Sequence, residues 1–182
     1  MESMLGKGKK TRRTYGLDEI SLCPSIVTIN PDDTDISVKI GSHKFSLPIV
    51  ASAMDGVVSP KTAILMGKHG GLGVLNLQGL WSRYENAEEQ LDKISSVSKE
   101  EYVPLMQKLY EEPMKDELII KRIKEIKAGG VITAVSSIPQ QAKRLGELAK
   151  KAGADIFVIQ STVISTKHKS KDSVICDSFL CL

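Results

Sequence analysis

Two short motifs constrain the fold of this chain more than any other part of its sequence. They are residues 47–55 (LPIVASAMD) and residues 69–76 (HGGLGVLN). Each motif holds a short apolar run, as expected of a strand that is covered on both faces. Between the motifs, Ser59 has the features of a helix N-cap and Pro60 those of the first helical residue. The motifs therefore predict two buried strands joined by a helix.

Polar or adaptable side chains stand at the carboxyl ends of both predicted strands. Ser52, Met54 and Asp55 follow the first strand, and Asn76 follows the second. In parallel α/β proteins, ligands bind at the carboxyl ends of the strands. We therefore expect these four residues to form one edge of a binding site.

Strand and helix patterns alternate along most of the chain. The predicted strands span residues 48–51, 72–75, 131–135 and 156–159, and the predicted helices span residues 62–68, 85–94, 100–110, 116–127 and 139–151. Upstream, residues 36–40 and 44–47 suggest a hairpin, whereas residues 1–13 are expected to be disordered. Such alternation predicts an α/β fold with parallel strands and right-handed crossovers. Two architectures fit this order, namely an open doubly wound sheet and part of an eight-stranded β/α barrel.

The composition is that of a soluble globular protein. Of the 182 residues, 41% are hydrophobic and 26% are charged, and this length permits one compact domain. The sequence holds no apolar run of the roughly 18 residues that a membrane span needs, and its start lacks the apolar core of a signal peptide. The three cysteines, Cys23, Cys176 and Cys181, have no metal-type spacing. We therefore expect reduced thiols, no metal site and a cytoplasmic protein.

Basic residues crowd the N-terminus, although the net charge is only +3. A basic arm can bind nucleic acid, but the modest total charge and the few aromatic residues favour a solvated terminus. We divide the chain into a basic arm with the hairpin (1–46), a β/α region (47–170) that contains a helical excursion (79–128), and an atypical tail (171–182).

The two motifs together resemble the IMP dehydrogenase / GMP reductase family, and most closely its CBS-less branch. The resemblance runs from residues 6–13 to about residue 170, and residues 131–135 and 155–162 resemble the third and fourth barrel strands of the family. It implies a partial TIM barrel, comprising about the first four β/α units. It also implies NAD-dependent oxidation of IMP to XMP in purine nucleotide metabolism, or reductive deamination of GMP, and a homo-oligomer for a full-length protein.

Carried over to this sequence, the resemblance implies that Ser52 and Met54 contact the purine nucleotide. Ser52 offers a hydroxyl, and Met54 offers an adaptable apolar surface to the base. Asp55 and Asn76 complete the expected substrate site. The residues alone leave other roles open, since Ser52 could bond nearby backbone, Met54 could fill the core and Asp55 could stabilise a turn.

Two departures from the family pattern affect the cofactor site. Where the dehydrogenases carry a His-His-Asn run after the second strand, this chain has residues 76–78 (NLQ). Where they place an Asp near the nicotinamide ribose, this chain has Gln160, followed by Ser161 and Thr162. A glutamine hydrogen-bonds a ribose hydroxyl but brings no charge. Gln160, Ser161 and Thr162 are therefore the expected NAD-binding residues.

The resemblance assigns no catalytic residue to this chain. In the family, oxidation proceeds through a covalent thioimidate on a cysteine that follows the sixth strand, whereas this chain reaches the fourth. We therefore expect the product of a truncated or frameshifted gene, inactive alone. Two alternatives remain, namely a non-catalytic half-barrel that binds a nucleotide or a partner chain, and another β/α-barrel enzyme that binds a phosphorylated ligand.

Overall fold

The chain forms two compact units, Met1–Asp35 and Ile36–Leu182, in a computed structural model that describes residues 2–4, 7–8 and 10–161. The first unit holds two antiparallel strands, β1 (Glu2–Met4) and β2 (Lys10–Arg12), and two 3-10 helices, η1 (Leu17–Glu19) and η2 (Pro31–Asp33). The strand pair shows that the expectation of disorder is wrong for residues 2–4 and 10–12. Gly8 adopts a positive φ of 79° between the strands, and this glycine conformation permits a tight reversal.

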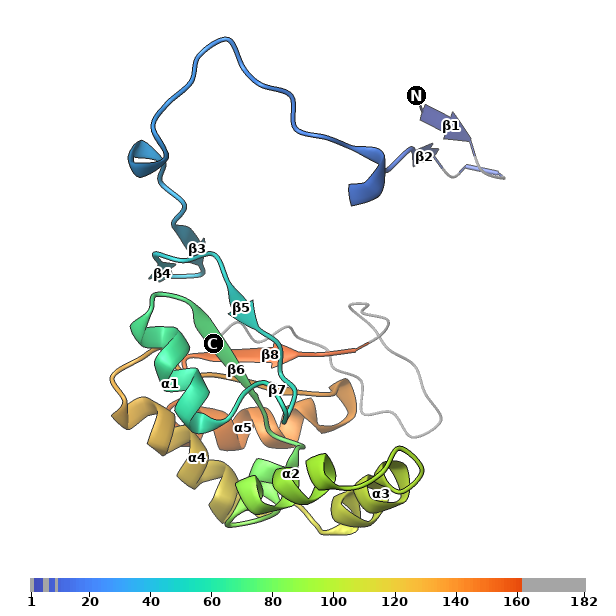
Figure 1. Ribbon diagram of the computed structural model, residues 1–182, viewed down its shortest axis with the longest axis vertical. Coiled ribbons are helices and arrows are strands. Elements are labelled where there is room, and N and C mark those ends of the chain that lie inside the picture. Colours follow the sequence, from blue (N-terminus) through green and yellow to red (C-terminus); the bar gives the residue numbers. More distant parts are fainter. Residues whose placement is uncertain (1, 5–6, 9, 162–182) are drawn as a thin grey trace. The chain divides into compact units, whose positions relative to one another are not determined.

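A four-stranded parallel sheet forms the centre of the second unit (Figure 1). Its strands, in spatial order, are β5 (Val50–Ala51), β6 (Leu72–Asn76), β7 (Ala134–Ser137) and β8 (Ile156–Ile159). The α-helices are α1 (Pro60–Lys68), α2 (Ala87–Ser96), α3 (Tyr102–Glu111), α4 (Asp116–Ala128) and α5 (Ala142–Ala152), with 3-10 helices η3 (Leu80–Ser82) and η4 (Pro139–Gln141). The hairpin β3 (Val38–Ile40) and β4 (His43–Phe45) precedes the sheet. The predicted α/β fold, the parallel strands and the hairpin are confirmed.

Helix α1 begins as its sequence predicts. The Ser59 hydroxyl accepts the Thr62 N–H at 3.0 Å, and the Thr62 hydroxyl accepts the Ser59 N–H at 2.6 Å. This reciprocal pair satisfies two backbone donors that the first helical turn leaves free. The helix then packs tightly on β6, because a Cβ at Gly73 would lie 2.7 Å from the Cα of Ala63.

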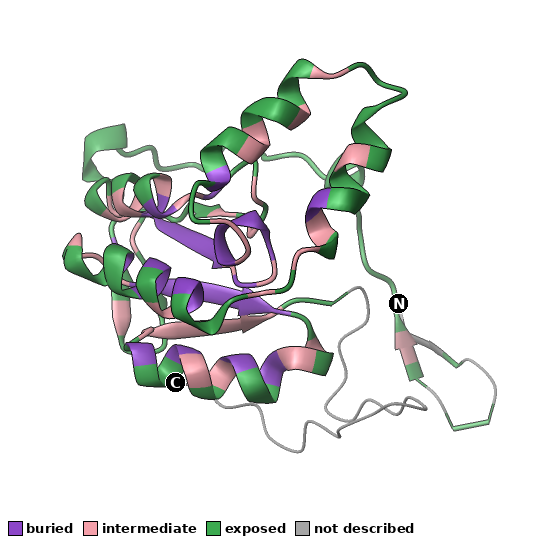
Figure 2. Ribbon diagram, turned by 90° about the horizontal axis from the view of Figure 1, so that it is seen from below, coloured by how far each residue is buried: buried purple, intermediate pink, exposed green. Residues whose placement is uncertain are grey.

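Helices α1, α4 and α5 cover the same face of the sheet, since α4 packs against both of the others (Figure 2). Between them and the sheet lies the larger hydrophobic core, where Leu75 of β6 and Val135 of β7 meet side chains such as Ile123 and Leu145. On the opposite face, Leu72, Val74, Ala134 and Phe45 form a smaller cluster. Alternate residues of each strand thus enter different cores.

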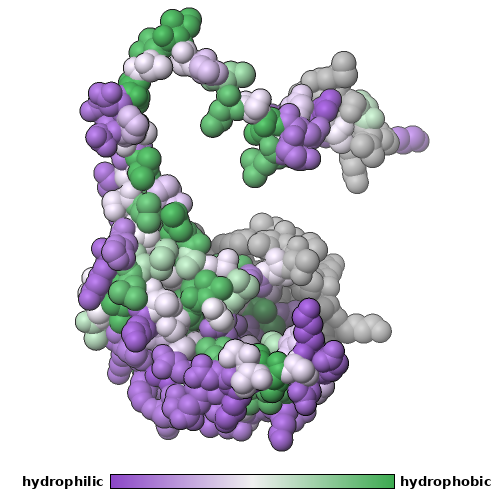
Figure 3. Space-filling view, viewed as in Figure 1, coloured by the Kyte–Doolittle hydropathy of each residue, from purple (hydrophilic) through white to green (hydrophobic). Residues whose placement is uncertain are grey.

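The first strand of the sheet is less covered than predicted. Val50 in β5 is 52% exposed, and Ile49 before it is 51% exposed. The expectation that this strand is buried on both faces is therefore wrong, because β5 lies at the edge of the sheet with β6 as its one neighbour among the described strands. In Figure 3 hydrophobic surface gathers around β5, whereas hydrophilic side chains dominate the surface over the helices.

Strand β7 and helix α5 begin three residues later than predicted. The Asp155 carboxylate accepts the Thr133 N–H at 2.9 Å, so a side chain takes the place of a strand partner before Ala134. Burial by itself raises the pKa of Asp155, but hydrogen bonds from Lys127 and from the Thr133 N–H hold it below its usual value.

After the strand, residues 139–141 form η4, and α5 starts at Ala142. The other helices begin within two residues of their predicted starts.

Candidate functional site

A cavity of about 790 Å³ lies at the carboxyl ends of the parallel strands. The alternation of the strands explains its polar wall, because Asn76, Ser136 and Gln160 each stand two residues beyond an apolar residue of the smaller core. The register pairs Asn76 with Ser136. The lining residues are Ala53, Asn76, Gln78, Arg83, Tyr110, Ser136, Ser137, Ile138, Pro139, Gln140, Gln160 and Ser161.

Side-chain amides tie together the loops that follow β6 and β7. The Asn76 Oδ1 accepts the Gln78 N–H at 3.0 Å. The Gln78 Oε1 in turn accepts the Ile138 N–H at 2.8 Å, across 60 residues of sequence. These bonds hold two walls of the cavity at a fixed separation.

Among the described residues that line the cavity, Arg83 alone is charged, and its guanidinium faces carbonyl groups. Its Nε and Nη2 donate to the Gln78 carbonyl at 3.2 and 3.1 Å, and its Nη1 donates to the carbonyls of Tyr110, at 2.9 Å, and Glu112. The guanidinium also lies 5.3 Å from the centre of the Tyr110 ring. Because carbonyls carry only partial charge, these hydrogen bonds do not cancel the positive charge of the guanidinium, and that charge favours an anionic group in the cavity.

Asp55 fastens the loop after β5 to two other segments. Its Oδ2 accepts the Leu80 N–H at 2.7 Å and a short hydrogen bond from the Tyr110 hydroxyl. Burial is the largest cause, and the hydrogen bond to Asp55 the second, of a Tyr110 pKa well above its ordinary value. This hydroxyl therefore keeps its proton and remains a donor. The Asp55 Oδ1 is buried with no hydrogen-bond partner among the described residues.

The loop after β6 is held from the other side by α4. Arg122 is only 7% exposed, and it donates to the Trp81 carbonyl at 3.3 Å and to the Glu85 carbonyl at 2.5 Å. Its guanidinium lies 5.4 Å from the centre of the Trp81 ring. Arg122 thereby ties η3, which precedes Arg83, to the helical layer.

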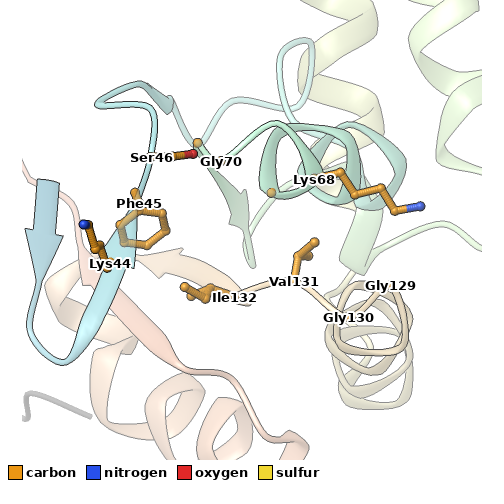
Figure 4. A pocket seen from close by; sticks show the side chains of 11 residues that line it. Lys44, Phe45, Ser46, Lys68, Gly70, Gly129, Gly130, Val131 and Ile132 are labelled. Atoms are coloured by element: carbon orange, nitrogen blue, oxygen red, sulfur yellow. The ribbon is translucent and has the colours of Figure 1, made fainter. Parts of the chain in front are cut away.

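A second cavity, of about 470 Å³, lies beside the loops that lead into β6 and β7 (Figure 4). Glycines and apolar side chains make up most of its wall, including the Phe45 ring and Ile132. Its polar side chains are Lys44, Ser46 and Lys68, and Lys68 extends away from Phe45 and Ile132 in Figure 4. Since the carboxyl-end cavity has more hydrogen-bonding side chains, it is the better candidate site.

The predicted site residues fall into two groups. Asn76, Gln160 and Ser161 line the carboxyl-end cavity. Ser52 and Met54 lie exposed near the end of β5, outside the set that lines it, and Asp55 makes the loop contacts above. Their roles in ligand binding stay predictions. Thr162, Cys176 and Cys181 lie outside the described residues, as does the tail 171–182.

Sequence reasoning missed nine of the twelve lining residues, among them the polar residues Gln78, Arg83, Tyr110, Ser136, Ser137 and Gln140. The two serines had a visible signal, because they follow the apolar residues of the third predicted strand directly. The predicted strand ends at Val135 and so excludes both serines, whereas β7 extends to Ser137.

The lining chemistry fits a nucleotide. Amides and hydroxyls such as those of Gln160 and Ser161 can exchange hydrogen bonds with ribose hydroxyls and base edges, and Arg83 suits a phosphate. Among the described residues, no group of three His, Cys, Asp or Glu side chains could hold a metal ion. In the same part of the chain, no helix is both long enough and apolar enough to cross a membrane.

Fold and cavity thus define a parallel α/β protein with a candidate ligand site at the carboxyl ends of its strands. Residues 14–175 match the IMP dehydrogenase / GMP reductase domain. An uncharacterized oxidoreductase of Mycolicibacterium smegmatis is 36% identical over 173 residues, which are 92% of this chain and 46% of the relative. The inosine-5'-monophosphate dehydrogenase of Methanocaldococcus jannaschii is 25% identical over 92% of this chain and 31% of its own length.

The fold has a close counterpart among crystal structures. An IMP dehydrogenase/GMP reductase-like protein from Corynebacterium glutamicum matches with a TM-score of 0.82 and 37% identity, over 92% of this chain and 46% of the other. The chain belongs to the IMP dehydrogenase / GMP reductase family, as its two strand motifs predict. It spans about half the length of the first curated relatives it matches.

Proposed function

We propose that this chain binds a purine nucleoside monophosphate, IMP or GMP, as part of an NAD-dependent IMP dehydrogenase-family oxidoreductase that converts IMP to XMP. The observation that carries the proposal is the polar wall of the carboxyl-end cavity, where Asn76, Ser136 and Gln160 lie at the carboxyl ends of three neighbouring strands. The family membership supports this choice of ligand and reaction. Reductive deamination of GMP is the related alternative.

We further propose that the sheet is the first part of a (β/α)8 barrel. Its strands lie in sequential order, and α1, α4 and α5 share one face, as barrel units do. A doubly wound sheet would place helices on both faces around a change in strand order. The predicted cytoplasmic location and the homo-oligomer of a full-length protein remain part of this proposal.

Five of the lining residues have a proposed task in binding. Asn76 and Ser136 exchange hydrogen bonds with the nucleotide, and Gln160 and Ser161 hold the ribose of NAD. Bound NAD would accept the hydride removed from the purine. Arg83 attracts the phosphate groups of either molecule.

A second candidate function is nucleotide binding without chemistry. Among the described residues that line the cavity there is no cysteine, the nucleophile that the family uses, and Cys23 is an exposed residue of the first unit. Nucleotide binding with no NADH formed from IMP and NAD would support this candidate. NADH production by the purified chain would refute it.

Nucleotide binding can be measured on the protein through its single tryptophan, Trp81, which lies in η3 near the cavity. We expect the emission to change on titration with IMP or GMP, with calorimetry as an independent measure. Gln160→Ala should weaken binding of NAD, whereas Gln107→Ala, an exposed glutamine of α3, should leave it unchanged. The proposal is wrong if neither purine nucleotide binds, and binding of FMN alone would favour a different barrel enzyme.

A further inference from the structure

One side chain joins the helical excursion to the candidate nucleotide site. After η3 the chain leaves the sheet and forms α2 and α3. Residues 112–115 then lead into α4, which packs on the sheet side again. Tyr110, one residue before the end of α3, is half-buried and lines the cavity. Its hydroxyl reaches Asp55, which stands 55 residues earlier in the chain.

The contact at Asp55 fixes the conformation of the loop after β5. Within this loop, the Met54 carbonyl accepts the N–H groups of Val57 and Val58, both at 2.9 Å, and the Met54 N–H donates to the Ser52 carbonyl at 2.8 Å. The loop is therefore a tight turn around Met54. Among the described residues, the side-chain link between this loop and the rest of the site is the Asp55 carboxylate.

Two donors share one oxygen of that carboxylate. The Leu80 N–H and the Tyr110 hydroxyl both bind Oδ2, while Oδ1 is buried without a partner among the described residues. A half-satisfied buried carboxylate depends strongly on the donors it has. Losing the Tyr110 hydroxyl would leave a single donor, so the loop could rotate away from η3.

Tyr110 is itself firmly placed, as a positioning group must be. Arg83 lies over its ring and binds its carbonyl at 2.9 Å, and the Tyr84 hydroxyl binds the Leu109 carbonyl at 3.0 Å. The end of α3 is thus fixed to the loop after β6 at three points. Movement of α3 would be transmitted to Asp55 through a rigid connection.

We propose that Tyr110 is a positioning residue that, through Asp55, holds in place the loop after β5, whose Ala53 lines the cavity, so that the α2–α3 excursion controls the affinity of the site for the purine nucleotide. This inference rests on the proposed function for the identity of the ligand. Tyr110 has no part in the chemistry. It acts on the nucleotide side of the site, and the cofactor side, at Gln160 and Ser161, lies on a different strand.

The test compares Tyr110→Phe with Tyr102→Phe, because Tyr102 is an exposed tyrosine of the same helix. Hydrogen exchange on the ligand-free protein comes first. We expect faster exchange over residues 52–58 and 79–82 in Tyr110→Phe only. Unchanged exchange would overturn the inference without reference to any ligand.

Binding measurements then distinguish a specific positioning role of Tyr110 from a general loosening of the site. Fully folded Tyr110→Phe should bind IMP about tenfold more weakly, the effect of losing one hydrogen bond to a charged group, while its affinity for NAD stays unchanged. An equal loss for both ligands, or none for IMP, would contradict the inference. Combining Tyr110→Phe with Asp55→Asn should give less than the sum of the two single effects on exchange, because both act on one contact.

The two proposals fail in different ways. If the unmodified protein binds neither IMP nor GMP while Tyr110→Phe still loosens residues 52–58, the proposed function falls and Tyr110 retains only its hold on the loop. The inference about affinity is then refuted as well. If IMP binds and the variant behaves as the unmodified protein, only the inference about Tyr110 is wrong.

Discussion

Replacing Arg122 with methionine should destabilise the protein by about 3.5–4 kcal/mol. The guanidinium is buried and makes charge-assisted hydrogen bonds to the carbonyls of Trp81 and Glu85, each contributing about 1.5 kcal/mol at the low end of the usual range. Its position over the Trp81 ring adds about 0.5–1 kcal/mol. Methionine keeps an apolar stem of similar length, so packing contributes little to the difference.

Urea unfolding followed by Trp81 emission and by far-UV circular dichroism measures this loss. With a slope of about 2 kcal/mol per molar urea, the midpoint should fall by about 1.5–2 M. The matched control is Lys121→Met on the same helix, whose exposed amine pairs with the Glu85 side chain. It should shift the midpoint by less than a quarter as much, because exposed ion pairs contribute little.

A midpoint shift below about 0.5 M for Arg122→Met would refute the reasoning, since it would mean that the buried hydrogen bonds of Arg122 contribute little to the free energy of unfolding. A shift seen by Trp81 emission alone would have a different meaning. It would show that the loop after β6 detaches while α4 and the sheet remain folded.

Two further substitutions test the packing and the charges of the β/α units. Gly73→Ala should lower the free energy of unfolding in urea by about 1–3 kcal/mol, because the added Cβ would meet the backbone of Ala63. The matched control is Gly146→Ala in α5, where the nearest atom to an added Cβ is 3.7 Å away, and it should stabilise the protein by about 0.5–1 kcal/mol. No loss of stability in Gly73→Ala would contradict the close approach of α1 to β6. Asp155→Asn should lower stability at pH 7 and lose this effect in acid, because a carboxylate with a lowered folded-state pKa stabilises above its unfolded pKa of about 3.9 and ceases to do so as the pH falls through the folded value. Equal losses at pH 7 and at about pH 2 would show that the ion pair with Lys127 is not the cause.

Local patterns sufficed for the parts of the fold that depend on neighbouring residues. Ser59 and Pro60 marked the start of α1, and the apolar run before Asn76 marked β6, since capping and buried strands have short-range signatures. The start of β7 was misplaced because a carboxylate 22 residues away, that of Asp155, takes the N–H of Thr133. Such a partner is invisible to periodicity.

In the candidate site too, the residues with a local sequence pattern could be predicted, and those placed by long-range contacts could not. Asn76 and Gln160 could be predicted, because each follows an apolar strand and the carboxyl ends of parallel strands share one edge. Arg83 and Tyr110 could not, because they belong to an excursion whose helices carry no local sign of where they return. Only the long-range contacts to Asp55 and to the loop carbonyls bring them to the cavity.

The brevity of β5 has a consequence for aggregation. An edge strand is a template on which another chain can add by backbone pairing, and long apolar edges are the most dangerous. Here the edge offers only Val50 and Ala51 in ladder geometry, and Pro48 upstream has no N–H to donate. The apolar side chains around β5 therefore sit on a backbone that offers few ladder hydrogen bonds to another chain, which lowers the tendency to form fibrils at this edge.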